Sequence, residues 1–184
     1  MPSDLRSDQR GPLTKPIGLE EIKGEISGTF VASAAERSAI AALLELPELA
    51  TLRLDYAVRR GGGGRHHLSG RLTADVTQTC VVTLEPVQGR VDVPVEVDFW
   101  PERLLAELEA RAEEGASDPG AEWPEPITEG KIDIGPLIYE TLATSLDPYP
   151  RREGASFEWA EGREKNGEEE KTSPFAALER LKRP

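Results

Sequence analysis

Apolar and polar positions alternate along three stretches in the middle of the chain, a period of two that is typical of half-buried strands. The first two stretches, Thr51–Arg60 and Leu68–Val76, are separated by the glycines Gly61–Gly64, so the pattern predicts a β-hairpin. In the third stretch five apolar residues share one face and Pro94 lies on the other, which places this strand at a sheet edge or beside a bulge. The alternating apolar residues are Leu52, Leu54, Tyr56 and Val58, then Leu68, Leu72, Ala74 and Val76, then Val91, Val93, Val95, Val97 and Phe99.

Three segments have signals of helices. Ser33 and Glu36 form the capping box that opens a helix, and Pro47 ends it. A charged helix is expected over 103–114, and a third over 135–146 with Pro136 in its first turn, where the missing N–H costs nothing. The apolar faces expected of the three helices are Ile40, Leu43 and Leu44, then Leu104, Leu105 and Leu108, then Ile134, Leu137, Ile138, Leu142 and Leu146.

These elements predict an α+β fold, in which an antiparallel sheet that could curl towards a barrel is flanked by two or three helices. Glu25–Val31 is a weaker strand candidate, and 115–130 is expected to be an acidic loop rich in proline and glycine. We expect the folded domain to span 17–159 after a flexible tail over 1–16. A charged linker over 160–172 lacks apolar periodicity and is expected to be disordered.

The last residues, 173–184, predict a short amphipathic helix. Pro174 occupies its first turn, and Phe175, Leu178 and Leu181 lie close to one face. A helix this short is not stable alone in water, so it must dock on something. The docking surface is either a partner or the chain's own sheet.

Composition limits the classes of function. The chain has 184 residues, a formal net charge of −12 and a pI near 4.7. Phosphate binding depends on Lys and Arg, so this charge excludes a uniformly basic protein that coats nucleic acid. A single cysteine, Cys80, excludes an intramolecular disulfide. Without a signal-like apolar segment or a membrane span, we expect a cytoplasmic protein that does not associate with a membrane.

The charge is unevenly distributed. Residues 100–130 hold nine acidic and two basic residues, whereas 53–71 hold five arginines and one acid. Arginine suits phosphate because its planar fork bonds bidentately, so the basic hairpin is a candidate RNA contact. The alternative is a solvated hairpin tip whose charges serve solubility. The candidate RNA-binding residues are Arg53, Arg59, Arg60, Arg65, His66 and Arg71.

No motif indicates a cofactor or catalysis. His66 and His67 are adjacent, and neighbours on a strand point to opposite faces, so a shared metal ion is not expected. The glycine run matches no phosphate-binding fingerprint. Neither HExxH nor GxSxG occurs, so we expect a protein that is not an enzyme.

The segment Thr79–Val87 joins two strands and reads TCVVTLEPV. From the residues alone, Cys80 is a small buried hydrophobe in a connection. The segment nevertheless resembles the signature of the YceD family, the large ribosomal RNA subunit accumulation proteins. The order of the other motifs agrees with this family, from the capped helix through the basic hairpin to 132–142 and the terminal PFAAL motif at 174–178. The residues of the family motif are Cys80, Leu84, Glu85 and Pro86.

The resemblance covers about 19–182 and implies a cytoplasmic bacterial protein that supports accumulation of large-subunit ribosomal RNA. Many relatives have a second cysteine where this chain has Thr83, so no thiolate metal or redox chemistry carries over to Cys80. We expect a non-enzymatic factor in large-subunit biogenesis. Its arginine hairpin would contact ribosomal RNA or a pre-ribosomal particle. Its acidic surface and terminal helix (Pro174, Phe175, Leu178 and Leu181) would engage a basic ribosomal protein or assembly factor. The alternative is a purely protein-binding adaptor without RNA contact.

Overall fold

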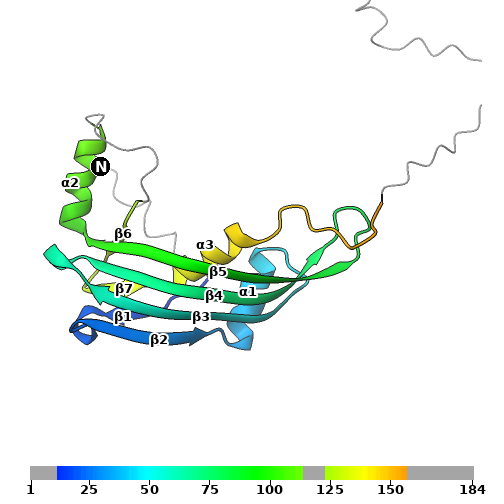
Figure 1. Ribbon diagram of the computed structural model, residues 1–184, viewed down its shortest axis with the longest axis horizontal. Helices are drawn as coiled ribbons and strands as arrows, with labels where there is room; N and C mark the ends of the chain where they lie inside the picture. The colour runs from blue at the N-terminus through cyan, green and yellow to red at the C-terminus, as the bar shows by residue number, and fades with distance from the viewer. Residues whose placement is uncertain (1–11, 114–122, 157–184) are drawn as a thin grey trace, which may run out of the picture.

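The computed structural model describes residues 12–113 and 123–156, which form an α+β fold (Figure 1). Two 3₁₀ turns, η1 (Leu19–Glu21) and η2 (Gly62–Gly64), connect strands. The strands and helices, in chain order, are β1 (Pro16–Gly18), β2 (Glu25–Val31), α1 (Ala34–Leu43), β3 (Glu48–Arg60), β4 (His66–Thr79), β5 (Pro86–Pro101), α2 (Glu102–Glu113), β6 (Glu125–Ile127), β7 (Lys131–Asp133) and α3 (Gly135–Ser145).

Five strands form one sheet in the order β2-β3-β4-β5-β6, and β1 pairs with β7 in a separate two-stranded sheet. Strands β2 to β5 are antiparallel to their neighbours, whereas β6 runs parallel to the end of β5. Among the described residues β2 and β6 do not pair with each other, so the sheet stays open. The prediction of an antiparallel sheet flanked by helices is confirmed. The prediction that the sheet could curl towards a barrel is wrong, because closure requires the two outer strands to meet.

The hairpin and the helix cap form as the sequence predicts. The β3–β4 register pairs Leu54 with Leu72 and ends at Arg60 opposite His66. In α1 the Glu36 N–H donates to Ser33 Oγ at 3.3 Å, and the Ser33 N–H donates to Glu36 Oε2 at 2.7 Å. The buried face of this helix is narrower than expected, because Leu43 is the last helical residue and is 58% exposed.

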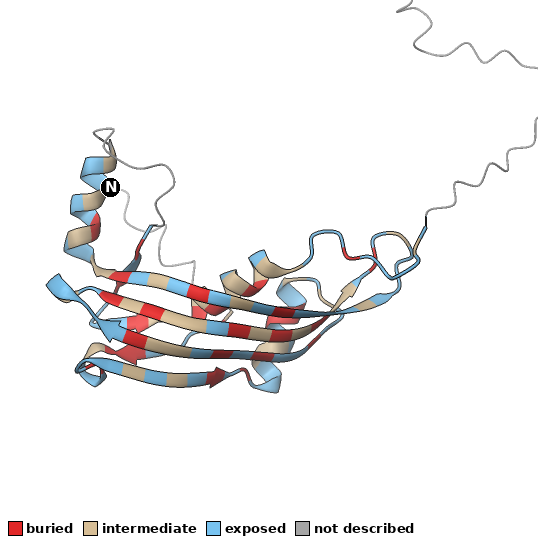
Figure 2. Cartoon of the chain, in the orientation of Figure 1, coloured by how far each residue is buried: buried red, intermediate tan, exposed pale blue. Residues whose placement is uncertain are grey.

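The core lies on one face of the five-stranded sheet. Buried residues alternate with exposed ones along β3, β4 and β5 (Figure 2). One continuous hydrophobic cluster joins this face to α1 through Ile40, to α3 through Ile138 and Leu142, and to the small sheet through Ile17 and Ile132. The opposite face carries polar side chains and has no described element packed over it. We call it the outer face.

Two segments differ from the expectation. Leu13, placed in the flexible tail, is buried, and the Ile134 N–H donates to the carbonyl of Lys15 at 3.1 Å. Strand β6 lies inside the stretch expected to be an acidic loop, and Ile127 is buried there. Three-residue strands are too short to produce a periodic signal. The predicted linker and terminal helix lie outside the described residues.

Candidate nucleic-acid interface

The turn between β3 and β4 closes the end of the sheet nearest α2. The Gly61 N–H donates to the carbonyl of Arg65 at 2.8 Å, which holds the turn together. Gly63 and Gly64 have φ values of +70° and +82°, a region that residues with a Cβ adopt only at a cost. The glycine run is therefore required by the backbone of the turn, and it projects the arginines on both sides of it to the end of the sheet.

Strand register divides five of the six candidate residues between two faces, and the sixth, Arg65, lies in the turn. Arg59 is opposite His67, which is opposite Asp98, and this row lies on the outer face. Arg60 is opposite His66, which is opposite Phe99, and this row lies on the core face. Neighbouring residues on a strand point to opposite sides. Arg59 and Arg60 therefore lie on opposite faces at the end of the sheet and do not share one surface.

Arg65 lies in the turn and stacks on an aromatic ring. Its guanidinium carbon is 4.0 Å from the centroid of the Trp100 ring. Such a cation–π contact contributes about 0.5–1 kcal/mol at exposed sites and orients the guanidinium. Trp100 was missed by the sequence interpretation. Its position follows from the register of β4 with β5, which no local motif reveals.

Arg53 and Arg71 are paired with carboxylates on the outer face. Arg53 binds Asp55 through two nitrogens at 2.6 and 2.7 Å, and Arg71 Nε lies 2.6 Å from Asp92 Oδ1. Hydrogen bonds from Arg53 and then from Thr29 lower the pKa of Asp55 to about 2. The charge of these two arginines is already neutralised locally. Among the described residues the arginines without an ion pair at this end of the sheet are Arg59, Arg60 and Arg65, and we call these three the arginine tip.

His66 does not lie on the surface. It is 4% exposed, and its Nδ1 atom has no hydrogen-bond partner. Burial lowers its pKa, so the ring is neutral at physiological pH. The sequence carried a signal for this, because His66 is in phase with the buried Leu68 and Leu72. His67 lies on the other face, as expected, with Nδ1 at 2.8 Å from Asp98 Oδ1. No group of three potential metal ligands occurs among the described residues.

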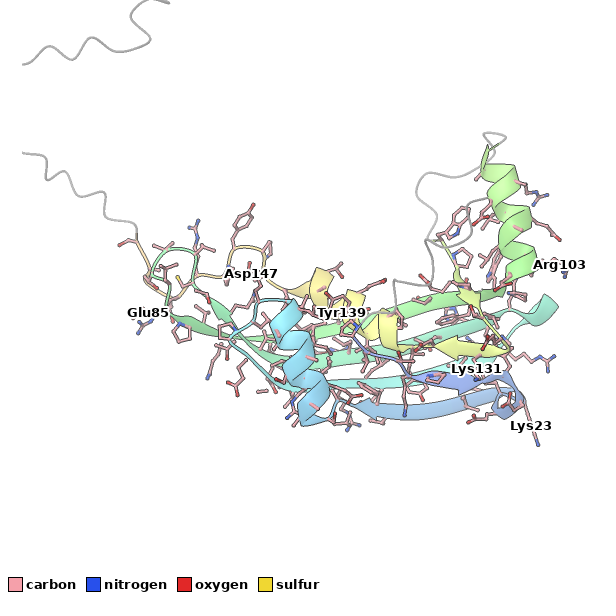
Figure 3. The ribbon with its side chains drawn as sticks, turned by 180° about the vertical axis from the view of Figure 1, so that it is seen from behind. Lys23, Glu85, Arg103, Lys131, Tyr139 and Asp147 are labelled. Atoms are coloured by element: carbon pink, nitrogen blue, oxygen red, sulfur yellow. The ribbon has the colours of Figure 1, made fainter. Side chains whose placement is uncertain are left out.

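The family-motif segment forms a closed loop at the opposite end of the sheet, where Figure 3 labels Glu85 far from Arg103. The Cys80 N–H donates to the carbonyl of Glu85 at 2.8 Å, and the Leu84 N–H donates to the carbonyl of Cys80 at 3.0 Å. Leu84 has a φ of +61° and is exposed. The Glu85 carboxylate also forms an ion pair with Arg152, which joins the loop to the chain after α3.

Cys80 is buried and organises this loop through its sulfur. Sγ accepts hydrogen bonds from the backbone N–H groups of Val82, Thr83 and Arg152, each at 3.4 Å. The Thr83 side chain and then the backbone N–H of Arg152 lower the pKa of Cys80 to about 6. The expectation of a buried residue is confirmed. Arg152 is a contact that sequence reasoning missed, since it is distant in the chain and belongs to no motif.

Acidic side chains gather in a groove between β5 and α3. We call the hollow lined by Glu96, Asp98, Glu125 and Glu140 the acidic groove, and its volume is about 400 Å³. Burial, and then the charge of Glu140, raises the pKa of Glu125. Only Glu125 of these four falls within the acidic stretch counted from the sequence. Folding therefore builds this surface from three separate segments.

Other findings complete the comparison with the sequence. The candidate partner residues Pro174, Phe175, Leu178 and Leu181 lie outside the described residues. Within the described ranges no helix is both long and apolar enough to cross a bilayer.

A family model described as the large ribosomal RNA subunit accumulation protein YceD matches residues 68–182.

The chain belongs to the YceD family. This confirms the family expected from the sequence, and membership implies a role in the accumulation of large-subunit ribosomal RNA. The YceD match includes β4 from Leu68 onwards, the Cys80 loop, β5 and α3, whereas β3 and the whole arginine tip precede it. Comparisons with curated proteins and with solved structures found no match.

Proposed function

We propose that the protein is a cytoplasmic, non-enzymatic factor in biogenesis of the large ribosomal subunit, and that its arginine tip contacts ribosomal RNA. The observation that supports this most strongly is that Arg59, Arg60 and Arg65 gather at one end of the sheet without a carboxylate partner among the described residues. Unpaired guanidinium groups are free to bind phosphates bidentately.

The setting of the tip also suits RNA. Arg65 stacks on Trp100, and aromatic rings and guanidinium planes are the surfaces on which unstacked RNA bases lie. Arg59 and Arg60 point to opposite sides of the sheet end, so together the three side chains can follow a backbone that passes around the hairpin. We leave His66 out of this surface because it is buried, and we assign Arg53 and Arg71 a smaller share because each is ion-paired.

The experiment compares two triple variants of the full chain. Arg59→Ala, Arg60→Ala and Arg65→Ala remove the tip. Filter binding to a transcript of large-subunit ribosomal RNA is titrated at about 50 and 200 mM salt. Loss of three phosphate contacts reduces the salt dependence of binding. The affinity of the wild-type protein should therefore fall about twentyfold more than that of the tip variant over this range. The matched control replaces three exposed arginines elsewhere, Arg90, Arg111 and Arg151, and it should behave as wild type.

If the two triple variants bind the transcript with equal affinity and equal salt dependence, the arginine tip does not contact RNA. The adaptor without RNA contact is the second candidate function, and the acidic groove is the observation that favours it. In both versions a basic ribosomal protein or assembly factor binds the acidic surface and the terminal segment 173–184.

Deletion of 173–184 separates these roles. If Pro174, Phe175, Leu178 and Leu181 bind a partner, the deletion lowers cosedimentation with large-subunit precursor particles and leaves the melting temperature unchanged. If the segment folds back on the sheet, the deletion lowers the melting temperature instead and partner binding to the remainder persists.

A further inference from the structure

One side of β5 is unpaired along most of its length. The strand pairs with β4 from Pro86 to Phe99, but β6 covers its other side only over Phe99–Pro101. In the described residues no other strand pairs with that side. Backbone N–H and C=O groups on such an edge are available to an incoming extended chain.

Pro94 limits where an incoming chain can pair. The β4–β5 register continues through Arg71 opposite Pro94 without a shift. A proline within a continuous ladder places its nitrogen on the free side of an edge strand, because a donor is not needed there. The free edge therefore lacks a donor at Pro94, which discourages long, indiscriminate pairing and favours a short contact.

The acidic groove opens beside this edge. Its walls include Val97 of β5, Pro124 before β6 and Leu137 of α3, and Trp123 is 48% exposed there. A second hollow of about 380 Å³ shares Glu125, Leu137 and Glu140 with it and is also lined by Glu129, Lys131 and Asp133. Its carboxylates outnumber its one lysine, so this neighbouring surface is acidic as well.

The charge of the groove selects the partner. Four carboxylates line it, and no lysine, arginine or histidine is among its described lining residues. Asp98 contacts His67, but no described cation pairs with Glu96, Glu125 or Glu140. Glu125 and Glu140 repel each other, and the repulsion is relieved when a cation lies between them. An aromatic ring at the rim adds a surface on which a guanidinium or ammonium group can stack.

We propose that the acidic groove binds an extended segment rich in lysine and arginine from a partner protein, whose backbone hydrogen-bonds to the free edge of β5. Alternate residues of that segment point towards Glu96 and Asp98 on the outer face. The residues between them point inwards, where their aliphatic stems lie on Val97 and Leu137 while their charges reach Glu125 and Glu140. This inference rests on the basic-partner half of the proposed function and names its site.

The probe is a fluorescein-labelled twelve-residue peptide in which pairs of lysines alternate with pairs of threonines, so that an extended chain carries lysine on both faces. Its binding to the full chain is followed by fluorescence anisotropy. The double variant Glu125→Gln with Glu140→Gln should bind roughly fivefold more weakly, since it loses two partly screened charge contacts. The control, Glu48→Gln with Glu153→Gln, makes the same change in net charge outside the groove and should bind as wild type. Trp123→Ala should also weaken binding, without changing the net charge.

A second peptide tests the strand pairing. N-methylation of every residue after the first keeps every side-chain charge but removes the amide donors on both edges of the peptide, so it should weaken binding about tenfold. Equal binding by the groove and control variants would show diffuse attraction only, and equal binding of the N-methylated peptide would exclude pairing with β5. Either result overturns the proposal. The peptide assay contains no RNA, so a negative result here does not contradict the proposed RNA contact. A negative result in the RNA-binding experiment likewise does not contradict the proposed peptide site in the groove.

Discussion

Replacement of Gly135 by alanine is expected to be strongly destabilising, although it adds a single methyl group. Gly135 is the first residue of α3, where the chain before β1 crosses over it. A Cβ at this position would lie 2.6 Å from the carbonyl carbon of Leu13 and 2.8 Å from Cα of Thr14, and closer still to the Leu13 carbonyl oxygen. All three atoms belong to the backbone, so no side-chain rotation can relieve the clash.

The cost follows from what must move. The Leu13–Lys15 segment is held by the Ile134 N–H donating to the carbonyl of Lys15 at 3.1 Å and by the Lys15 N–H donating to Asp133 Oδ1 at 2.7 Å. Displacement of the segment stretches both bonds, each worth about 0.5–1.5 kcal/mol, and overpacking adds about 1–3 kcal/mol. We therefore expect Gly135→Ala to lose about 3 kcal/mol of unfolding free energy.

Urea denaturation followed by circular dichroism measures this loss. Gly24→Ala is the matched control, because a Cβ there would meet no atom within 4 Å and the residue does not have a positive φ. The control should change stability by no more than about 1 kcal/mol, in the stabilising direction. If Gly135→Ala loses no more than Gly24→Ala, the packing of the β1 segment over α3 is not as described.

Three further outcomes are expected. Leu142→Ala opens a cavity in the α3 side of the core and should cost about 2–5 kcal/mol in urea denaturation, and a loss below 1 kcal/mol would contradict its place there. Ser33→Ala removes the cap of α1 and should cost about 1 kcal/mol, whereas the adjacent Ala34→Ser should leave the cap intact. The pKa of Cys80, lowered to about 6, makes its contribution to stability complete above the usual thiol pKa near 8.5 and lost as the pH falls through about 6. The stability difference between wild type and Cys80→Ala should therefore widen from pH 6 to pH 9, and a constant difference would show that the thiolate is not favoured in the folded state.

Elements with a repeating local signal could be predicted from the sequence. The β3–β4 hairpin has two alternating strands around a glycine turn, and α1 has both halves of its capping box. Each signal lies within a few residues, so it does not depend on distant parts of the chain. Strand β6 and the β1–β7 pair have no such signal, because each strand is three residues long and is held by partners far away in the sequence.

The candidate site was less predictable, because register decides which residues meet. The arginines were grouped by their nearness in the chain, yet Arg59 and Arg60 project to opposite faces and Arg53 is already paired with Asp55. The alternation of inward and outward residues along β4 could have identified His66 as buried. Nothing local could have placed Trp100 against Arg65 or brought Glu140 beside Glu125, since those contacts depend on how separate elements pack.

The length of β4 fixes the distance between the two ends of the molecule. Its 14 residues run from the arginine tip to Cys80, and at about 3.3 Å per residue they span about 46 Å. Arg152 is joined to the Cys80 loop, so the last described residues lie at the end away from the arginines. The sheet therefore holds these two ends at a fixed separation. If the proposed RNA contact forms at the arginine tip and a second contact forms at the other end, a precursor particle that offers both sites at this separation gains avidity of about 10²–10⁴ over either contact alone. Two weak contacts would then be enough to distinguish an assembled particle from free RNA or free protein.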